Sequence, residues 1–172
     1  EALKESVNRI LSISVVHEFL SQQGDENIDV MEVTKNILQL IQQNMLDSHF
    51  KLETEFIGET IILPSKQASN LALIINELIL NSIEHGFLGR NYGKIGLKIS
   101  QSDEAYIIEL YDNGNGLPEK FFDLPTKSLG LQIVRTLIEG DMNGSFDLYN
   151  DNGVHAKIAI PYKFLMESEV DV

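Results

Sequence analysis

Four stretches of the chain carry patterns that predict helices. In residues 1–23 a stripe of small and apolar side chains recurs at helical spacing, and the polar run 24–27 then interrupts it; the stripe comprises Leu3, Val7, Ile10, Leu11, Ser14 and Val15. Asp29 can cap a second helix, which we expect to end near residue 47. Pro64 suits the first turn of a third helix that continues to about His85. A fourth helix is predicted to begin near Ser128.

Residues 51–57 alternate between apolar and polar side chains, and other short stretches also suit strands. We expect them at residues 51–57, 60–63, 94–100, 105–111, 145–149 and 154–161. Helices beside such strands predict an α+β fold, namely a two-layer α/β sandwich whose mixed sheet is covered by helices on one face. Residues 24–164 would form this domain, residues 1–23 a short helical segment before it, and residues 165–172 a frayed acidic tail.

Composition narrows the classes of function. The chain has 172 residues, of which 43% are hydrophobic, and its formal net charge is −13. This charge argues against binding to nucleic acid, which depends on Lys and Arg that neutralise phosphates. No cysteine is present, so disulfides and thiolate metal sites are excluded. No apolar run reaches the roughly 18 residues of a membrane span and no signal peptide is visible, so we expect a cytoplasmic location, or the cytoplasmic side of a membrane-bound parent.

A polar stripe interrupts the third predicted helix. Glu77 and Asn81 are four residues apart, and Glu84 and His85 follow at seven and eight, which places all four on one side of the helix. The opposite side, suited to packing on the sheet, carries Leu71, Ile75, Leu78, Ser82 and Ile83. The stripe favours a ligand site, and the alternative is a solvated helix face.

A carboxylate ends the strand predicted at 105–111. Asp112 is followed by Gly114 and Gly116 and then by Leu117. This arrangement offers one fixed acceptor beside a backbone that can approach a flat ligand closely. A tight surface turn would explain the same residues. Further along the chain, Gly130 lies near the start of the fourth helix, where free amides and the helix dipole favour a phosphate group.

These three motifs, in this order, resemble the ATP-binding domain of sensor histidine kinases within the GHKL ATPase superfamily. The resemblance implies ATP and Mg²⁺ as cofactors, with Asn81 as the metal ligand and Glu77 as the residue that orients or deprotonates the attacking group. It also implies that Asp112 accepts a hydrogen bond from the adenine amine, and that residues 119–128 form a short lid over the nucleotide. The implied cofactor-binding residues are Asn81, Glu84, His85, Asp112, Gly114, Gly116, Leu117, Lys127, Ser128, Leu129, Gly130 and Leu131.

Two positions depart from the family pattern. Ser128 stands where the second glycine motif often begins with glycine, and one backbone approach can therefore differ. Gly153-Val154 stands where many relatives carry Gly-Thr, which removes a hydroxyl that often helps to hold the adenine through water. We expect both changes to weaken nucleotide affinity without abolishing it.

The first helix resembles the end of the dimerisation region in a group of histidine kinases with short lids. That group carries its phosphoacceptor in a His-Arg-x-Lys-Asn-Asn run, which this sequence lacks. We therefore expect the phosphoacceptor histidine to lie outside this chain, and the chain to bind ATP without labelling itself. His17 is the alternative phosphoacceptor. The implied partners are histidine-bearing dimerisation helices, a response regulator receiver domain and a second copy of the parent protein.

Other functions remain open at this point. The topoisomerase, chaperone and mismatch-repair branch of the superfamily shares the Glu-x-x-x-Asn pair, but those proteins couple ATP hydrolysis to a following domain. An anti-sigma-factor serine kinase is also small, although the helix before residue 24 speaks against it. The third alternative is a nucleotide-sensing module without catalysis, which would not need Glu77, Asn81, Asp112, Gly114 and Gly130 all to be intact. Fold alone would not separate these functions.

Overall fold

The computed structural model describes residues 13–14, 17, 21, 27–121 and 129–167. Most of the helix predicted at 1–23 therefore lies outside the described residues, as do Lys127, Ser128 and the end of the acidic tail. The few described residues between 13 and 21 are helical. Within the described part of the chain, no helix combines the length and apolar character that a membrane span requires.

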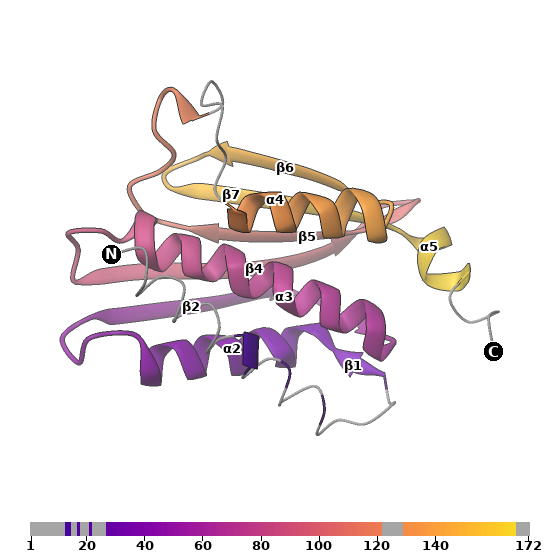
Figure 1. The fold of residues 1–172 in the computed structure, drawn as a ribbon, viewed down its shortest axis with the longest axis horizontal. Helices are drawn as coiled ribbons and strands as arrows, with labels where there is room; N and C mark the ends of the chain where they lie inside the picture. The colour runs from indigo at the N-terminus through magenta and orange to yellow at the C-terminus, as the bar shows by residue number, and fades with distance from the viewer. Residues whose placement is uncertain (1–12, 15–16, 18–20, 22–26, 122–128, 168–172) are drawn as a thin grey trace.

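A mixed sheet forms one layer of the molecule (Figure 1). Its strand order is β2-β4-β5-β7-β6, in which β2 and β4 are parallel and the other neighbouring pairs are antiparallel. The strands are β2 Lys51–Gly58, β4 Tyr92–Gln101, β5 Ala105–Asp112, β6 Ser145–Asn150 and β7 Val154–Pro161. Two further short strands, β1 Ile28–Asp29 and β3 Ile62–Leu63, pair with each other apart from this sheet. This architecture confirms the predicted α+β class.

Helices form the second layer, namely α2 Val30–Asn44, α3 Ser65–Asn81 and α4 Leu129–Arg135. A further helix, α5 Tyr162–Glu167, follows β7 beyond the end of the sheet (Figure 1). In Figure 1, α3 and α4 cross the same face of the sheet, and α2 packs beside α3. The predicted cap is present, because the Asp29 side chain accepts a hydrogen bond from the Glu32 amide at 2.9 Å. Helix α5 was not predicted, and its last residues belong to the stretch 165–172 that was expected to fray.

Side-chain alternation along β5 places Asp112 on the face of the sheet that the helices cover. Ile108 and Leu110 point into the core between sheet and helices, where Leu71 and Ile75 of α3 are also buried. Successive side chains of a strand point to opposite faces, so Asp112 follows Leu110 onto the same helix-covered face. It is only 4% exposed. The fold thus places a carboxylate at the end of an apolar row, beneath the helices.

The end of α3 is wider than an ordinary helix. Ser82–Gly86 continues α3 as a π-helical turn, and the Phe87 amide donates to the Ser82 carbonyl at 2.8 Å, five residues back. Turns of this type are uncommon and often occur at functional sites. The side-chain directions after Ser82 therefore no longer follow the spacing of 3.6 residues per turn on which the predicted polar stripe depended.

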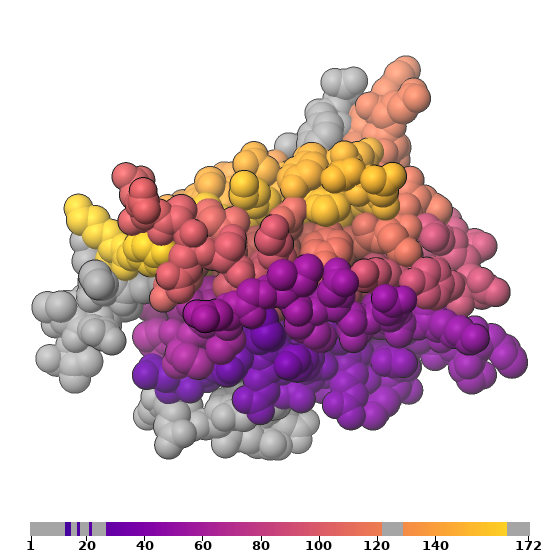
Figure 2. Space-filling model, turned by 180° about the vertical axis from the view of Figure 1, so that it is seen from behind, coloured from indigo at the N-terminus to yellow at the C-terminus, as the bar shows by residue number. Residues whose placement is uncertain are grey.

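The opposite face of the sheet is not covered by α3 and α4, and Figure 2 views the molecule from that side. A row of rings crosses it, in which His155 stacks between Tyr111 and Tyr149 with both ring centroids 5.2 Å away. Glu109 contacts the His155 Nδ1 at 2.8 Å and accepts from the Tyr149 hydroxyl at 2.6 Å. This hydrogen bond to Glu109 is the main reason that the pKa of Tyr149 is raised to about 12. Tyr111 therefore lies on this opposite face of the sheet, whereas its neighbour Asp112 lies on the face that the helices cover.

Candidate functional site

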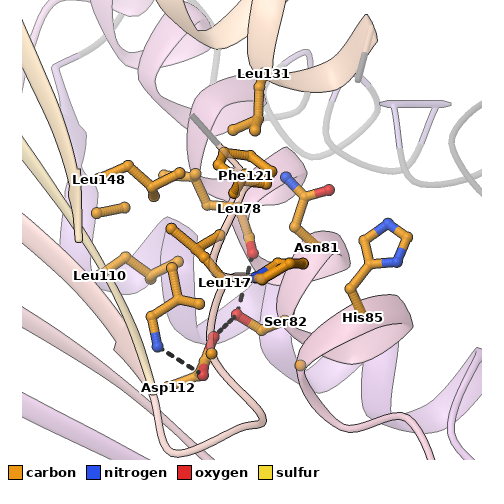
Figure 3. Close-up of a pocket in the computed structure, with 15 residues that line it drawn as sticks. Leu78, Asn81, Ser82, His85, Leu110, Asp112, Leu117, Phe121, Leu131 and Leu148 are labelled. Atoms are coloured by element: carbon orange, nitrogen blue, oxygen red, sulfur yellow. Dashed lines mark hydrogen bonds between the residues drawn. The ribbon is translucent and has the colours of Figure 1, made fainter. Parts of the chain in front are cut away.

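A cavity of about 270 Å³ opens between α3, the loop after β5 and the strands β6 and β7 (Figure 3). Among the described residues fifteen line it, and most of them are apolar: Leu78, Asn81, Ser82, His85, Gly86, Leu110, Asp112, Gly116, Leu117, Pro118, Phe121, Leu131, Leu148, Val154 and Ala156. Figure 3 shows Asp112 and Ser82 at one end, with Leu131, Phe121 and Leu148 toward the other. The cavity is thus an apolar slot with one charged end.

Three hydrogen bonds hold the Asp112 carboxylate. Its Oδ1 accepts from the Gly114 amide at 2.8 Å and from the Val154 amide at 3.1 Å. Its Oδ2 accepts from the Ser82 hydroxyl at 2.6 Å. Donors that converge on a carboxylate fix its orientation. The apolar slot therefore ends in a rigid carboxylate acceptor.

Glycines allow the segments around Asp112 to approach one another. A Cβ at Gly114 would lie 2.6 Å from the Gly86 carbonyl oxygen, and one at Gly153 would lie 1.9 Å from the Asp112 carbonyl oxygen. Gly153 also has a φ of +142°, a conformation that other residues rarely adopt. A Cβ at either position would push the loop after β5 away from α3 or from β7.

The walls of the slot suit a flat, largely apolar ring. Leu110, Leu148 and Ala156 come from adjacent strands of the sheet, whereas Leu117 and Phe121 come from the segment after the glycines. A ring that enters between these walls would bring its edge to Asp112. Because that residue offers an acceptor, the edge must present a donor such as an aromatic amine.

Asn150 fixes one of these walls, and the sequence did not identify it. Its Oδ1 accepts from the Leu117 amide at 2.8 Å, and its Nδ2 donates to the Leu117 carbonyl at 3.1 Å. The side chain at the end of β6 thereby holds both backbone groups of a residue that lines the cavity. Asn150 is 33 residues away in sequence, so no local pattern could have revealed this contact.

The polar stripe of the third helix divides into two pairs. Asn81 and His85 line the cavity, and the Asn81 Nδ2 atom is buried without a hydrogen-bond partner among the described residues. Glu77 and Glu84 do not belong to the lining that the described residues form, and Glu77 is only 3% exposed. The structure thus brings Asn81 and His85 to the cavity together with Asp112, and leaves the two glutamates beside it.

The residues that were expected to bind the nucleotide at the start of α4 differ in whether they line the cavity. Leu131 lines the cavity, and Gly130 before it is buried. Leu129, by contrast, is 65% exposed and does not belong to the lining. In the loop after β5, Gly116 and Leu117 line the cavity, and Gly114 contributes its amide to Asp112.

Ser82 is a second residue of the site that the sequence did not identify. Helical spacing assigned it to the face that packs on the sheet, and it does face the sheet. Its contact there is the Asp112 carboxylate, 30 residues away, rather than an apolar side chain. Its position directly after Asn81 was the only available signal, and a small polar residue there is equally compatible with packing.

This chain is similar to known ATPases and histidine kinases. The family model described as histidine kinase-, DNA gyrase B- and HSP90-like ATPase matches residues 66–164, and a second model, described as histidine kinase, matches residues 1–45. The sensor histidine kinase PdtaS of Mycobacterium tuberculosis is 34% identical over 164 residues, which are 94% of this chain and 32% of the relative. Blue-light-activated histidine kinase 2 of Erythrobacter litoralis is 30% identical over 56% of this chain and 28% of its own length. The chain therefore spans about a third of the length of these relatives.

Solved structures share the fold. The histidine kinase domain of the Erythrobacter litoralis blue-light-activated kinase superposes with a TM-score of 0.76 at 21% identity, covering 95% of this chain and 82% of that one. The histidine kinase AdeS of Acinetobacter baumannii gives 0.60 at 20% identity, covering 94% and 79%. The first family model spans more than half of the sequence, including every residue that lines the cavity. The chain belongs to the histidine kinase-, DNA gyrase B- and HSP90-like ATPase family.

Proposed function

We propose that this chain is the ATP-binding catalytic part of a two-component sensor histidine kinase. The observation that carries the proposal is the buried Asp112 carboxylate, held by three donors at the end of an apolar slot that Asn81 also lines. The relatives named as histidine kinases, one of them a sensor histidine kinase, support the same assignment. ATP would enter with its adenine in the slot and its phosphates toward Asn81 and the start of α4.

Asp112 would select the base. The exocyclic amine of adenine donates a hydrogen bond to the carboxylate, whereas guanine presents a carbonyl oxygen at the same ring position. A buried acceptor left without a donor costs roughly 1–3 kcal/mol, so this single carboxylate favours ATP over GTP.

Asn81 fits the role of a magnesium ligand. It lines the cavity, where its side-chain amide supplies one oxygen atom. The amide oxygen is a hard ligand of the type that Mg²⁺ prefers, and it adds no charge beside a triphosphate. Bound there, Mg²⁺ would offset the charge that develops during phosphoryl transfer.

Glu77 and the start of α4 would serve the phosphate end. Glu77 precedes Asn81 by one helical turn, and we assign it the orientation or deprotonation of the attacking group. Gly130 and Leu131 lie in the first turn of α4, where amides without helical partners favour an anion. Lys127 and Ser128, just before this turn, are proposed to contact the nucleotide as well.

The acceptor of the phosphoryl group would be a histidine on the dimerisation helices of the parent protein. A ring nitrogen of that histidine attacks the γ-phosphorus, the bond to the β-phosphate oxygen breaks, and ADP leaves. A response regulator receiver domain then receives the phosphoryl group. The parent would act as a homodimer in the cytoplasm, where ATP is available, or on the cytoplasmic side of a membrane.

The experiment adds the dimerisation helices of the parent protein, as a separate protein, to this chain with Mg²⁺ and γ-labelled ATP. We expect label on the added protein, acid-labile and base-stable as phosphohistidine is, and none on this chain alone. Label on serine or threonine would instead favour the anti-sigma-factor kinase. Hydrolysis of ATP without label on any protein would favour the gyrase and chaperone branch. Self-labelling that His17→Ala abolishes would assign the phosphoacceptor to His17.

Asn150 yields a prediction for the same site. Asn150→Ala removes both hydrogen bonds to Leu117 and so releases one wall of the adenine slot. We expect ATP affinity to fall by roughly three- to tenfold, the amount that one or two exposed hydrogen bonds are worth. Calorimetric titration measures the affinity, and Asn152→Ala, at the exposed tip of the same hairpin, is the control. Equal affinities of Asn150→Ala and the wild type would show that Leu117 does not depend on this clamp.

A further inference from the structure

Ser82 lies at the charged end of the cavity and has no role in the proposed reaction. It is 8% exposed, and its hydroxyl lies 2.6 Å from Asp112 Oδ2 and 3.3 Å from the Leu78 carbonyl oxygen. A hydroxyl has a single proton to donate. The shorter contact leads to a carboxylate and the longer one to a neutral carbonyl, so the proton belongs to Asp112.

The hydrogen bonds to Asp112 occupy some of the lone-pair positions at which its carboxylate can accept a hydrogen bond. A carboxylate has about four lone-pair positions, two on each oxygen. The Gly114 and Val154 amides occupy both positions of Oδ1. From the described residues, Oδ2 accepts only the hydrogen bond of Ser82. One acceptor position therefore remains on Oδ2, and Asp112 lines the cavity.

Gly86 limits the space around this position. A Cβ at residue 86 would lie 3.5 Å from Asp112 Oδ2, so the backbone of the π turn stands directly beside the open acceptor. Ser82 begins that turn and Gly86 ends it. Oδ2 thus has the Ser82 hydroxyl on one side and the backbone of the π turn on the other.

We propose that Ser82 is a specificity-determining positioning residue, which turns Asp112 into an acceptor for one N–H of a 6-aminopurine. This inference rests on the proposed function, because it concerns the base of the bound nucleotide. Ser82 holds Oδ2 in place through its hydroxyl and occupies the second lone-pair position, which water would otherwise fill. The Ser82 hydroxyl oxygen also keeps lone pairs of its own. The charged end of the slot therefore presents hydrogen-bond acceptors, and it selects a base whose ring edge carries a hydrogen-bond donor.

The test compares ATP with purine riboside triphosphate, which carries hydrogen in place of the amine. Calorimetric titrations are run on the wild type, Ser82→Ala and Ser82→Thr. We expect Ser82→Ala to bind ATP roughly tenfold more weakly and the analogue less than about twofold more weakly, since only ATP uses the acceptor that Ser82 positions. Ser82→Thr keeps the hydroxyl and should retain the wild-type preference for ATP over the analogue.

Ser69→Ala is the matched control. Ser69 lies in α3, and its hydroxyl donates to the Ser65 carbonyl, four residues back, at 2.8 Å. It has the same side chain in the same helix but no contact with Asp112, and the preference for ATP should be unchanged. Equal losses for ATP and the analogue in Ser82→Ala would overturn the inference, because they would mean a general structural role.

The outcomes also separate this inference from the proposed function. A wild-type chain that binds ATP but whose preference for it does not depend on Ser82 contradicts the inference alone. A wild-type chain that binds neither ATP nor the analogue contradicts the proposed function, and the inference with it. Melting temperatures of the variants without nucleotide show whether each one is folded.

Discussion

Replacing Asp112 with asparagine is expected to weaken ATP binding by roughly a hundredfold. The Gly114 and Val154 amides both donate to Oδ1, so they will hold the amide oxygen of asparagine at that position. The amide nitrogen then takes the place of Oδ2, where the adenine amine arrives. Two donors would face each other in a buried site, which costs more than the loss of one hydrogen bond.

Calorimetric titration of ATP into the folded variant measures this effect. Asp141→Asn provides the control, because it makes the same substitution at an exposed position after α4, away from the cavity. The control should bind ATP as the wild type does. Wild-type affinity in Asp112→Asn would remove Asp112 from the recognition of adenine.

Replacing Asn81 with alanine is expected to have a second large effect, and one that depends on the metal. In the presence of Mg²⁺ the variant should lose at least about tenfold in ATP affinity, because even residues that only support a metal ligand contribute that much. Without Mg²⁺ the loss should be much smaller, since the amide serves the metal rather than the base. The difference between the two losses is the quantity of interest.

Titrations with and without Mg²⁺ supply both values. Asn44→Ala is the control, because Asn44 also lies at a helix end and donates only to the Leu40 carbonyl, at 2.9 Å. Equal losses in the two conditions would mean that Asn81 has a structural role. Glu77→Gln, measured in parallel, should chiefly lower the rate of phosphoryl transfer rather than the affinity for ATP.

Local patterns in the sequence were sufficient to predict most helices and strands. Asp112 ends an apolar run, and the strand indeed ends at that residue. Asp29 is a typical capping residue, and the helix indeed begins directly after it. Such features depend on a few neighbouring residues. The parallel pairing of β2 with β4 depends on residues about 40 positions apart, and the sequence pattern alone could not predict it.

The site was predicted in part, and the missing residues share a physical reason. The resemblance to histidine kinases identified Asn81, His85, Asp112 and Leu131, all of which line the cavity. Ser82 and Asn150 act through contacts that cross 30 and 33 positions of the chain. Helical spacing also fails as a guide after Ser82, because the π turn changes the directions of the side chains that follow.

A structure of this chain with Mg²⁺ and a non-hydrolysable ATP analogue is the most direct test of whether ATP binds in this cavity with its adenine at Asp112. The adenine amine is predicted to lie within hydrogen-bond distance of Asp112 Oδ2, between the walls formed by Leu110 and Leu117. Mg²⁺ is predicted to contact the amide oxygen of Asn81 and the phosphates. A nucleotide bound elsewhere, or bound in this cavity with its base away from Asp112, would contradict the proposed binding mode of ATP.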